Sequence, residues 1–189
     1  MATNLVESVQ QKLNVEELQK IDPDTGEVFE TDKPKNKFYQ LAIPAILTGL
    51  YGFTRIDEGD RNILNGNAGN LISSIFGEKK NDVISKIANI SSTPLNVINE
   101  KFEKIGEAII TTLKEHLPKT SADSDVKNFL TSQRHHILSY LDPALQLGQY
   151  LKDDTIDDST NKMEGPVSGL MHNLGQIFSE SGNDKKEEI

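Results

Sequence analysis

The chain has 189 residues, 35% of them hydrophobic, with no cysteine and a formal net charge of −9. This length fits one domain with a tail, and it is enough to bury a core without a disulfide or a metal ion. The lack of cysteine excludes disulfides, thiolate metal sites and cysteine nucleophiles, and the negative charge opposes nonspecific binding to nucleic acid or anionic lipid.

The N-terminal region begins with an amphipathic stretch over residues 5–21, in which apolar residues recur mostly every third or fourth position. Two pairs, Asn4 with Glu7 and Asn14 with Glu17, match the pattern of residues that cap helix starts. We therefore expect two short helices that meet at Asn14. The first residues lack a basic region followed by an apolar run, so the expected location is the cytoplasm.

Residues 38–53 are the most apolar part of the chain and are hydrophobic nearly all round, which predicts a central, buried helix. Pro44 is expected to kink this helix or to lie in its first turn. A membrane span is the alternative interpretation. It needs about 20 apolar residues, whereas this run has 16 and is interrupted by Gln40, Pro44, Thr48 and Gly49.

The middle of the chain is expected to be helical after a loop at residues 56–69. Two short helices are predicted over residues 71–76, closed by Gly77, and over residues 82–88. The periodicity is clearest over residues 94–116, which predicts one long helix. Its apolar stripe has a spacing of three or four throughout: Leu95, Ile98, Phe102, Ile105, Ile109 and Leu113.

Hydroxyl-bearing and proline residues mark the expected helix ends. Residues 91–93 are expected to cap the long helix, with Pro94 at or near its first position. Thr131 is expected to separate two short helices, the second of which ends at Asp142 and Pro143. No stretch alternates apolar and polar residues for long enough to predict a sheet.

The composition changes at residue 152. Residues 152–189 contain nine acidic residues and four lysines, which is −5 of the net charge, and such a segment is expected to be a solvated tail. Within it, residues 166–178 place their apolar residues on one helical face. We expect this face to be an interaction surface, and we call it the tail stripe: Val167, Leu170, Met171, Leu174, Ile177 and Phe178.

A search for chemistry finds no phosphate loop, nucleophile elbow, dinucleotide fingerprint or zinc-binding helix. His135 and His136 are adjacent, so on a helix they diverge by about 100° and do not easily share a metal. They are expected to be one surface and one boundary residue. The enzymatic alternative pairs His136 or His116 with a carboxylate, for example in the acidic residues 57–60, as a general base.

Three stretches together are similar to a known family. They are residues 41–50 (LAIPAILTGL), 69–77 (GNLISSIFG) and 129–138 (FLTSQRHHIL). In this order and spacing they resemble the YidB-like family of bacterial domains, a family of unknown function. The resemblance covers residues 38–148. It implies an all-helical domain, and it brings no established activity, cofactor or catalytic residue.

The expected fold is therefore all-α, a multihelical single domain with a central buried helix and an acidic C-terminal tail that carries one amphipathic helix. We expect an N-terminal helix and polar linker at 1–37, the YidB-like helical domain at 38–151, and the tail at 152–189. The expected function is a non-enzymatic module that binds a protein partner or itself, without cofactor, metal or nucleic acid. An enzyme with a His–carboxylate pair and a peripheral membrane protein that uses residues 38–53 are the alternatives.

Overall fold

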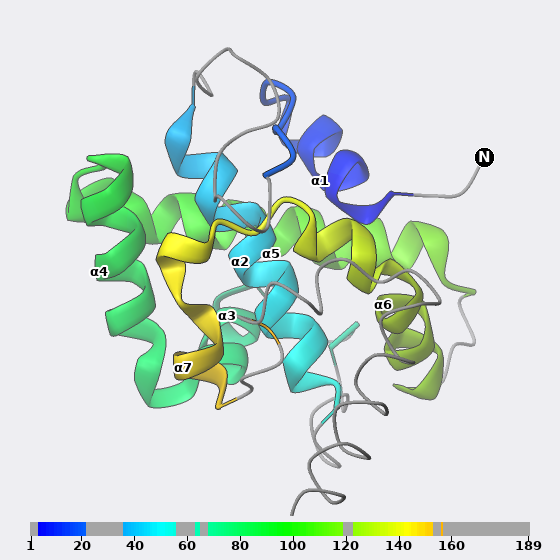
Figure 1. Cartoon of the computed structure of the whole chain (residues 1–189). Helices are drawn as coiled ribbons and strands as arrows, with labels where there is room; N and C mark the ends of the chain where they lie inside the picture. The colour runs from blue at the N-terminus through cyan, green and yellow to red at the C-terminus, as the bar shows by residue number, and fades with distance from the viewer. Residues whose placement is uncertain are drawn as a thin grey trace, which may run out of the picture.

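The computed structural model describes residues 4–21, 36–55, 63–64, 68–118, 123–152 and 156. These residues form an all-α fold, as the sequence predicts (Figure 1). The helices are α1 (Leu5–Leu13), α2 (Lys37–Phe53), α3 (Ala68–Phe76), α4 (Lys80–Ser91), α5 (Leu95–His116), α6 (Asp123–Leu138) and α7 (Leu147–Leu151), with 3-10 turns η1 (Gly77–Lys79) and η2 (Pro143–Leu145).

Helix α2 passes through the middle of the molecule and contacts every other α-helix (Figure 1). All of its residues from Gln40 to Tyr51 are buried, which confirms the predicted central helix. Pro44 lies inside α2, beyond the first turn, where it supplies no N–H to the carbonyl of Gln40. Among the described residues, no helix combines the length and the apolar character needed to cross a membrane.

Helices α2 and α3 approach each other closely at Gly49. A Cβ atom at this position would overlap the Ile75 side chain and would lie 3.0 Å from the ring of Phe76. Only glycine therefore fits α2 at this contact. The short helix predicted at residues 71–76 is present as α3, and Gly77 after it takes the left-handed conformation with φ 51°.

The first helix is capped as the sequence predicts. The side-chain oxygen of Asn4 accepts hydrogen bonds from the amides of Val6 and Glu7, and its Nδ2 donates to Glu7 Oε1 at 2.7 Å. The predicted second helix from Asn14 is wrong. Asn14 instead ends α1 in the left-handed conformation (φ 51°), and residues 15–20 are not helical.

Buried glutamine side chains hold this non-helical segment. Gln10 Oε1 accepts from the Leu18 amide at 3.0 Å, and Gln40 both accepts from the Gln19 amide and donates to the Gln19 carbonyl, each at 2.8 Å. These carboxamides satisfy backbone groups that a helix would otherwise satisfy itself. Helix α1 packs on α5, α2 and α6, and its buried residues belong to the same hydrophobic core as α2.

The turn between α4 and α5 differs from the prediction in its capping. Ser92 ends α4 with φ 56°, and the Ser91 hydroxyl donates to Thr93 Oγ1 at 2.8 Å instead of capping α5. Pro94 stands at the predicted start of α5 as its N-cap residue, and no side chain caps this end. Leu95 is 58% exposed, so the buried stripe of α5 begins only at Ile98.

Helix α6 is continuous, so the predicted break at Thr131 is wrong. The Thr131 hydroxyl donates to the carbonyl of Lys127 at 2.8 Å, four residues back in the same helix. The hydroxyl is therefore used within α6 and does not cap the start of a new helix. Asp142 caps the turn η2 by accepting from the Ala144 amide at 2.9 Å. Beyond α7, Ile156 is again buried in the core.

Candidate functional site

The tail stripe lies outside the described residues: Val167, Leu170, Met171, Leu174, Ile177 and Phe178. The acidic residues 57–60 and His172 also lie outside them. The nearest described residue before the tail stripe is Ile156, which is 1% exposed. The chain is thus anchored to the helical body ten residues before residue 166.

The described histidines do not gather in a site. His116 is exposed at the end of α5, where its Nδ1 lies 2.8 Å from the Thr112 carbonyl and its ring stacks on Phe129. His135 is exposed and His136 is half-buried, as predicted. Within the described ranges no ion pair joins a histidine to a carboxylate.

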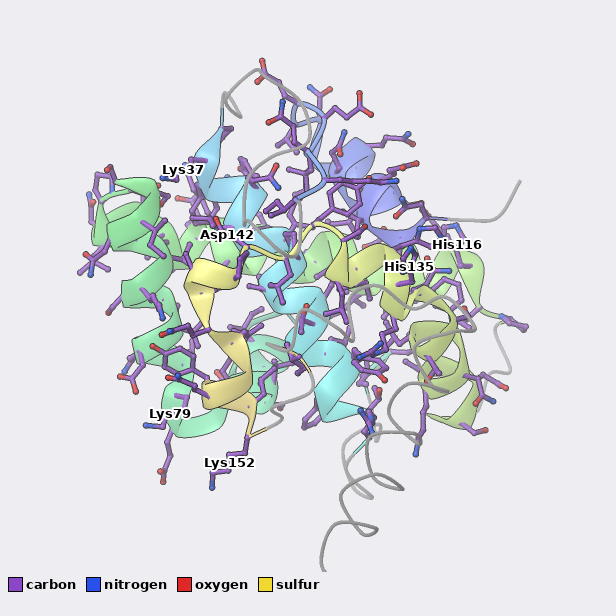
Figure 2. All side chains as sticks on the ribbon, in the orientation of Figure 1. Lys37, Lys79, His116, His135, Asp142 and Lys152 are labelled. Carbon is purple, nitrogen blue, oxygen red and sulfur yellow. The ribbon has the colours of Figure 1, made fainter. Side chains whose placement is uncertain are left out.

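No metal site is found in the part of the chain that the structure describes. None of its histidine, aspartate and glutamate side chains form a group of three or more that is able to hold an ion. Figure 2 shows that Lys79 and Lys152 lie at the opposite side of the molecule from His116 and His135. The titratable groups are therefore spread over the surface.

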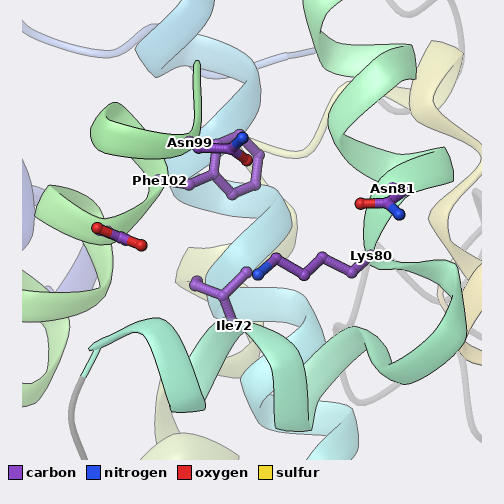
Figure 3. A pocket seen from close by; sticks show the side chains of 6 residues that line it. Ile72, Lys80, Asn81, Asn99 and Phe102 are labelled. Carbon is purple, nitrogen blue, oxygen red and sulfur yellow. The ribbon is translucent and has the colours of Figure 1, made fainter. Parts of the chain in front are cut away.

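A cavity of about 300 Å³ lies between α3, α4 and α5 (Figure 3). Its lining combines two apolar residues with an ammonium, a carboxylate and two carboxamides: Ile72, Lys80, Asn81, Asn99, Phe102 and Glu103. Ile72 and Phe102 are each 1% exposed and belong to the core, whereas Asn81, Asn99 and Glu103 are exposed at the opening.

Local structure explains how these side chains meet. Lys80 is the first residue of α4, directly after η1, and its side chain reaches back toward Ile72 of α3, where Nζ donates to Ser73 Oγ at 3.2 Å (Figure 3). Asn99 and Glu103 are four residues apart on α5 and so lie on one helical face. No ion pair joins Lys80 to Glu103, although both line the cavity.

This cavity has almost no signature in the sequence. On α5 the polar residues at positions 99 and 103 lie beside the apolar stripe. Their spacing of four residues is the only local feature of the sequence that indicates a shared polar face. That α4 begins opposite them depends on how α3, η1 and α4 fold against α5.

A second cluster of charged residues belongs to α5 and lies beside the start of α2. The Lys101 ammonium is 4.9 Å from the centroid of the Phe38 ring and 5.7 Å from that of Tyr39, within the range of cation–π attraction. Beside it, Lys104 and Glu100 form an ion pair of 2.7 Å. The hydrogen bond from Lys104 lowers the pKa of Glu100, and the same bond raises the pKa of Lys104. The Lys101 contacts join α5 to α2, whereas the Glu100–Lys104 pair lies within α5.

Comparison with models of protein families, with curated proteins and with solved structures gives no match to this chain. The resemblance to the YidB-like family therefore stays a prediction from the three sequence stretches.

Proposed function

We propose that this chain is a non-enzymatic helical module that associates with itself through the tail stripe. One contrast supports the proposal. Leu95 is the only large hydrophobic side chain that is exposed among the described residues, whereas residues 166–178 keep six apolar residues at helical spacing. Six such side chains favour a partner over water, because burial of apolar surface is the main driving force of association.

The best complement for the tail stripe is the same stripe in a second copy. A single exposed leucine on the described body offers too little apolar area to cover six side chains. Positions 167, 170, 174 and 177 follow the seven-residue repeat by which helices pair, and positions 171 and 178 widen this face as in helical bundles. A helix of about 13 residues is marginal alone in water, so pairing would supply its order.

The charge of the tail gives this proposal a distinctive signature. Residues 152–189 carry −5, so two paired tails repel each other. Added salt screens this repulsion. Self-association through the tail stripe is therefore expected to strengthen as the ionic strength rises. Binding of the tail to a basic protein would instead weaken as the ionic strength rises.

Sedimentation equilibrium of the full chain at low and high salt tests the proposal. We expect association that increases with salt in the unchanged chain and a monomer for Leu174→Asp. Gln176→Asp is the matched control, because it adds the same charge on the opposite face of the same segment and is expected to associate normally. A full chain that stays monomeric at every concentration and salt level would show that the proposal is wrong.

Two observations favour this function over the alternatives. The described histidines are dispersed and lack carboxylate partners, which does not favour a His–carboxylate enzyme. Residues 40–51 of α2 are buried by the other helices, so this apolar part of the helix offers no surface to a membrane. We also propose that the protein is bacterial and cytoplasmic, that it is related to the YidB-like family, and that it needs neither a cofactor nor a metal.

A further inference from the structure

We propose that the cavity between α3, α4 and α5 binds a small zwitterion, an α-amino acid. In this arrangement the ligand carboxylate lies at the Lys80 ammonium and the ligand ammonium at the Glu103 carboxylate. This inference is independent of the tail stripe and of self-association.

The two charges of the cavity carry the proposal. Lys80 Nζ donates to the neutral Ser73 hydroxyl at 3.2 Å and makes no ion pair within the described part of the chain, although an ammonium has three donors. The Glu103 carboxylate likewise makes no hydrogen bond or ion pair with the described residues. Opposite charges that line one cavity from two helices, without joining each other, are complementary to a molecule that carries both charges.

Other ligand classes fit this lining less well. A simple anion would gain a bond to Lys80 but would be repelled by Glu103, and a simple cation would meet the reverse situation. A zwitterion meets both groups with charge-assisted hydrogen bonds and brings no net charge into the cavity.

The uncharged lining defines the rest of the ligand. Ile72 and Phe102 lie beneath the cavity, and because each is only 1% exposed they offer little apolar surface to a ligand. The carboxamides of Asn81 and Asn99 offer both donors and acceptors at the opening. A volume of about 300 Å³ is at the lower limit of ligand pockets, so the cavity suits a small metabolite and not a nucleotide cofactor.

Titration of L-leucine into the isotopically labelled full chain, followed by amide chemical shifts, tests the proposal. We expect saturable shifts at the amides of Lys80, Asn81, Asn99 and Phe102. Isoamylamine lacks the carboxylate of leucine and 4-methylpentanoate lacks its ammonium, so each is expected to bind roughly tenfold more weakly or worse, because one charge-assisted bond is lost.

Two substitutions and two controls complete the experiment. Lys80→Met and Glu103→Gln remove one charge each with little change of shape, and both are expected to weaken leucine binding roughly tenfold or more. Lys114→Met and Glu17→Gln remove the same charges from exposed positions outside the cavity lining and are expected to bind normally. Glu103→Gln keeps the test decisive if Lys80→Met disturbs α4.

Three results would each overturn the proposal. They are the absence of saturable shifts at the cavity up to about 20 mM leucine, a concentration that detects millimolar dissociation constants, equal binding of leucine and both mimics, and unchanged leucine affinity in Glu103→Gln.

Discussion

Two buried threonines show how strongly one hydrogen bond depends on its surroundings. The Thr112 hydroxyl donates to the Ala108 carbonyl at 2.7 Å, whereas the Thr48 hydroxyl is fully buried in α2 and has no partner among the residues that the structure describes. An unpaired buried polar group costs about 1–3 kcal/mol. Thr48→Val, which keeps the shape of the side chain, is therefore expected to raise the free energy of unfolding by about 1 kcal/mol.

Urea unfolding with an unchanged m-value measures this effect. Thr112→Val is the matched control, because it removes a satisfied hydroxyl and is expected to lower the free energy of unfolding by about 1 kcal/mol. A loss of stability in Thr48→Val as large as that in the control would contradict the prediction.

Tyr140 is expected to make stability depend on pH in the alkaline range. Burial first, and then the charge of Glu7, whose Oε1 lies 3.4 Å from the hydroxyl, raise the pKa of Tyr140 above its ordinary value of 10.0. The folded protein therefore holds this proton more tightly than the unfolded chain. The stabilisation is complete below about pH 10 and is lost as the pH rises through the folded pKa.

Melting temperatures between about pH 9 and 11 measure this dependence, because that interval spans the ordinary tyrosine pKa. The unchanged protein is expected to lose stability more steeply than Tyr140→Phe, which lacks the titrating hydroxyl. Parallel curves for the two proteins would show that Tyr140 does not contribute.

At the scale of helices, the contact between α2 and α3 depends on Gly49. An added Cβ would overlap Ile75, so Gly49→Ala is expected to destabilise the protein by about 1–3 kcal/mol, as overpacking does. Gly52→Ala in the same helix is the control. Its Cβ would make an ordinary contact of 3.8 Å with Leu151, so it is expected to gain up to about 1 kcal/mol from helix propensity.

Thermal or urea unfolding of the two variants separates these effects, because the chemical change is identical. If both alanine variants are more stable than the unchanged protein, the prediction is wrong. Helix α3 would then shift at little cost, and the close contact at Gly49 would not contribute to stability.

The extended segment after α1 depends on Gln40. Gln40→Met keeps the size of the side chain but leaves the amide and the carbonyl of Gln19 without their partner. We expect hydrogen exchange at the Gln19 amide to accelerate strongly, with a loss of about 2 kcal/mol in overall stability for two lost bonds. Gln10→Met is the comparison, because it releases only the Leu18 amide. Unchanged protection of Gln19 in the Gln40 variant would contradict the assignment.

Much of the helical structure was predictable because it follows from the local periodicity of apolar residues. Helices α2 and α5 follow from their apolar patterns, and they begin and end within a residue of the expected positions. The end of α1 at Asn14 was predicted, but the lack of a second helix after it was not predictable, because the side chain that holds Gln19 comes from a residue 21 positions later. Thr131 can either cap a helix or bond within one, and the local sequence does not distinguish these.

The cavity could not be predicted from the sequence for a similar reason. Lys80 and Glu103 belong to different helices, and only the packing of α3, α4 and α5 brings both to one space. Exposed polar residues beside an apolar stripe occur on most surface helices. The tail stripe, in contrast, was readable from the sequence and remains a prediction.

At the scale of the whole molecule, one hydrophobic core joins residues from α1 to Ile156. Ile46 is fully buried in α2 at its centre, so Ile46→Asp places an unpaired charge in the interior and is expected to unfold the protein. The loss should reach α1, α6 and α7 together, because they share this core. Circular dichroism and the melting transition report it.

Leu95→Asp is the control for this substitution. Leu95 is 58% exposed, and an acidic residue at the first position of α5 interacts favourably with the helix dipole. We expect its melting temperature to change little. An Ile46→Asp protein that melts like the unchanged chain would mean that α2 is not the centre of the fold.

The distance along the chain between α1 and its partners has a consequence for synthesis in the cell. The Leu5 amide donates to Gln133 Oε1, 128 residues later, and the buried face of α1 packs on α5 and α6. At about 5–20 residues per second, a ribosome needs on the order of ten seconds to add the residues between them. During that interval Leu5, Val6 and Val9 lack their partners in α5 and α6, and we therefore expect chaperones to bind α1. Pauses in translation before residue 133 would prolong that exposure.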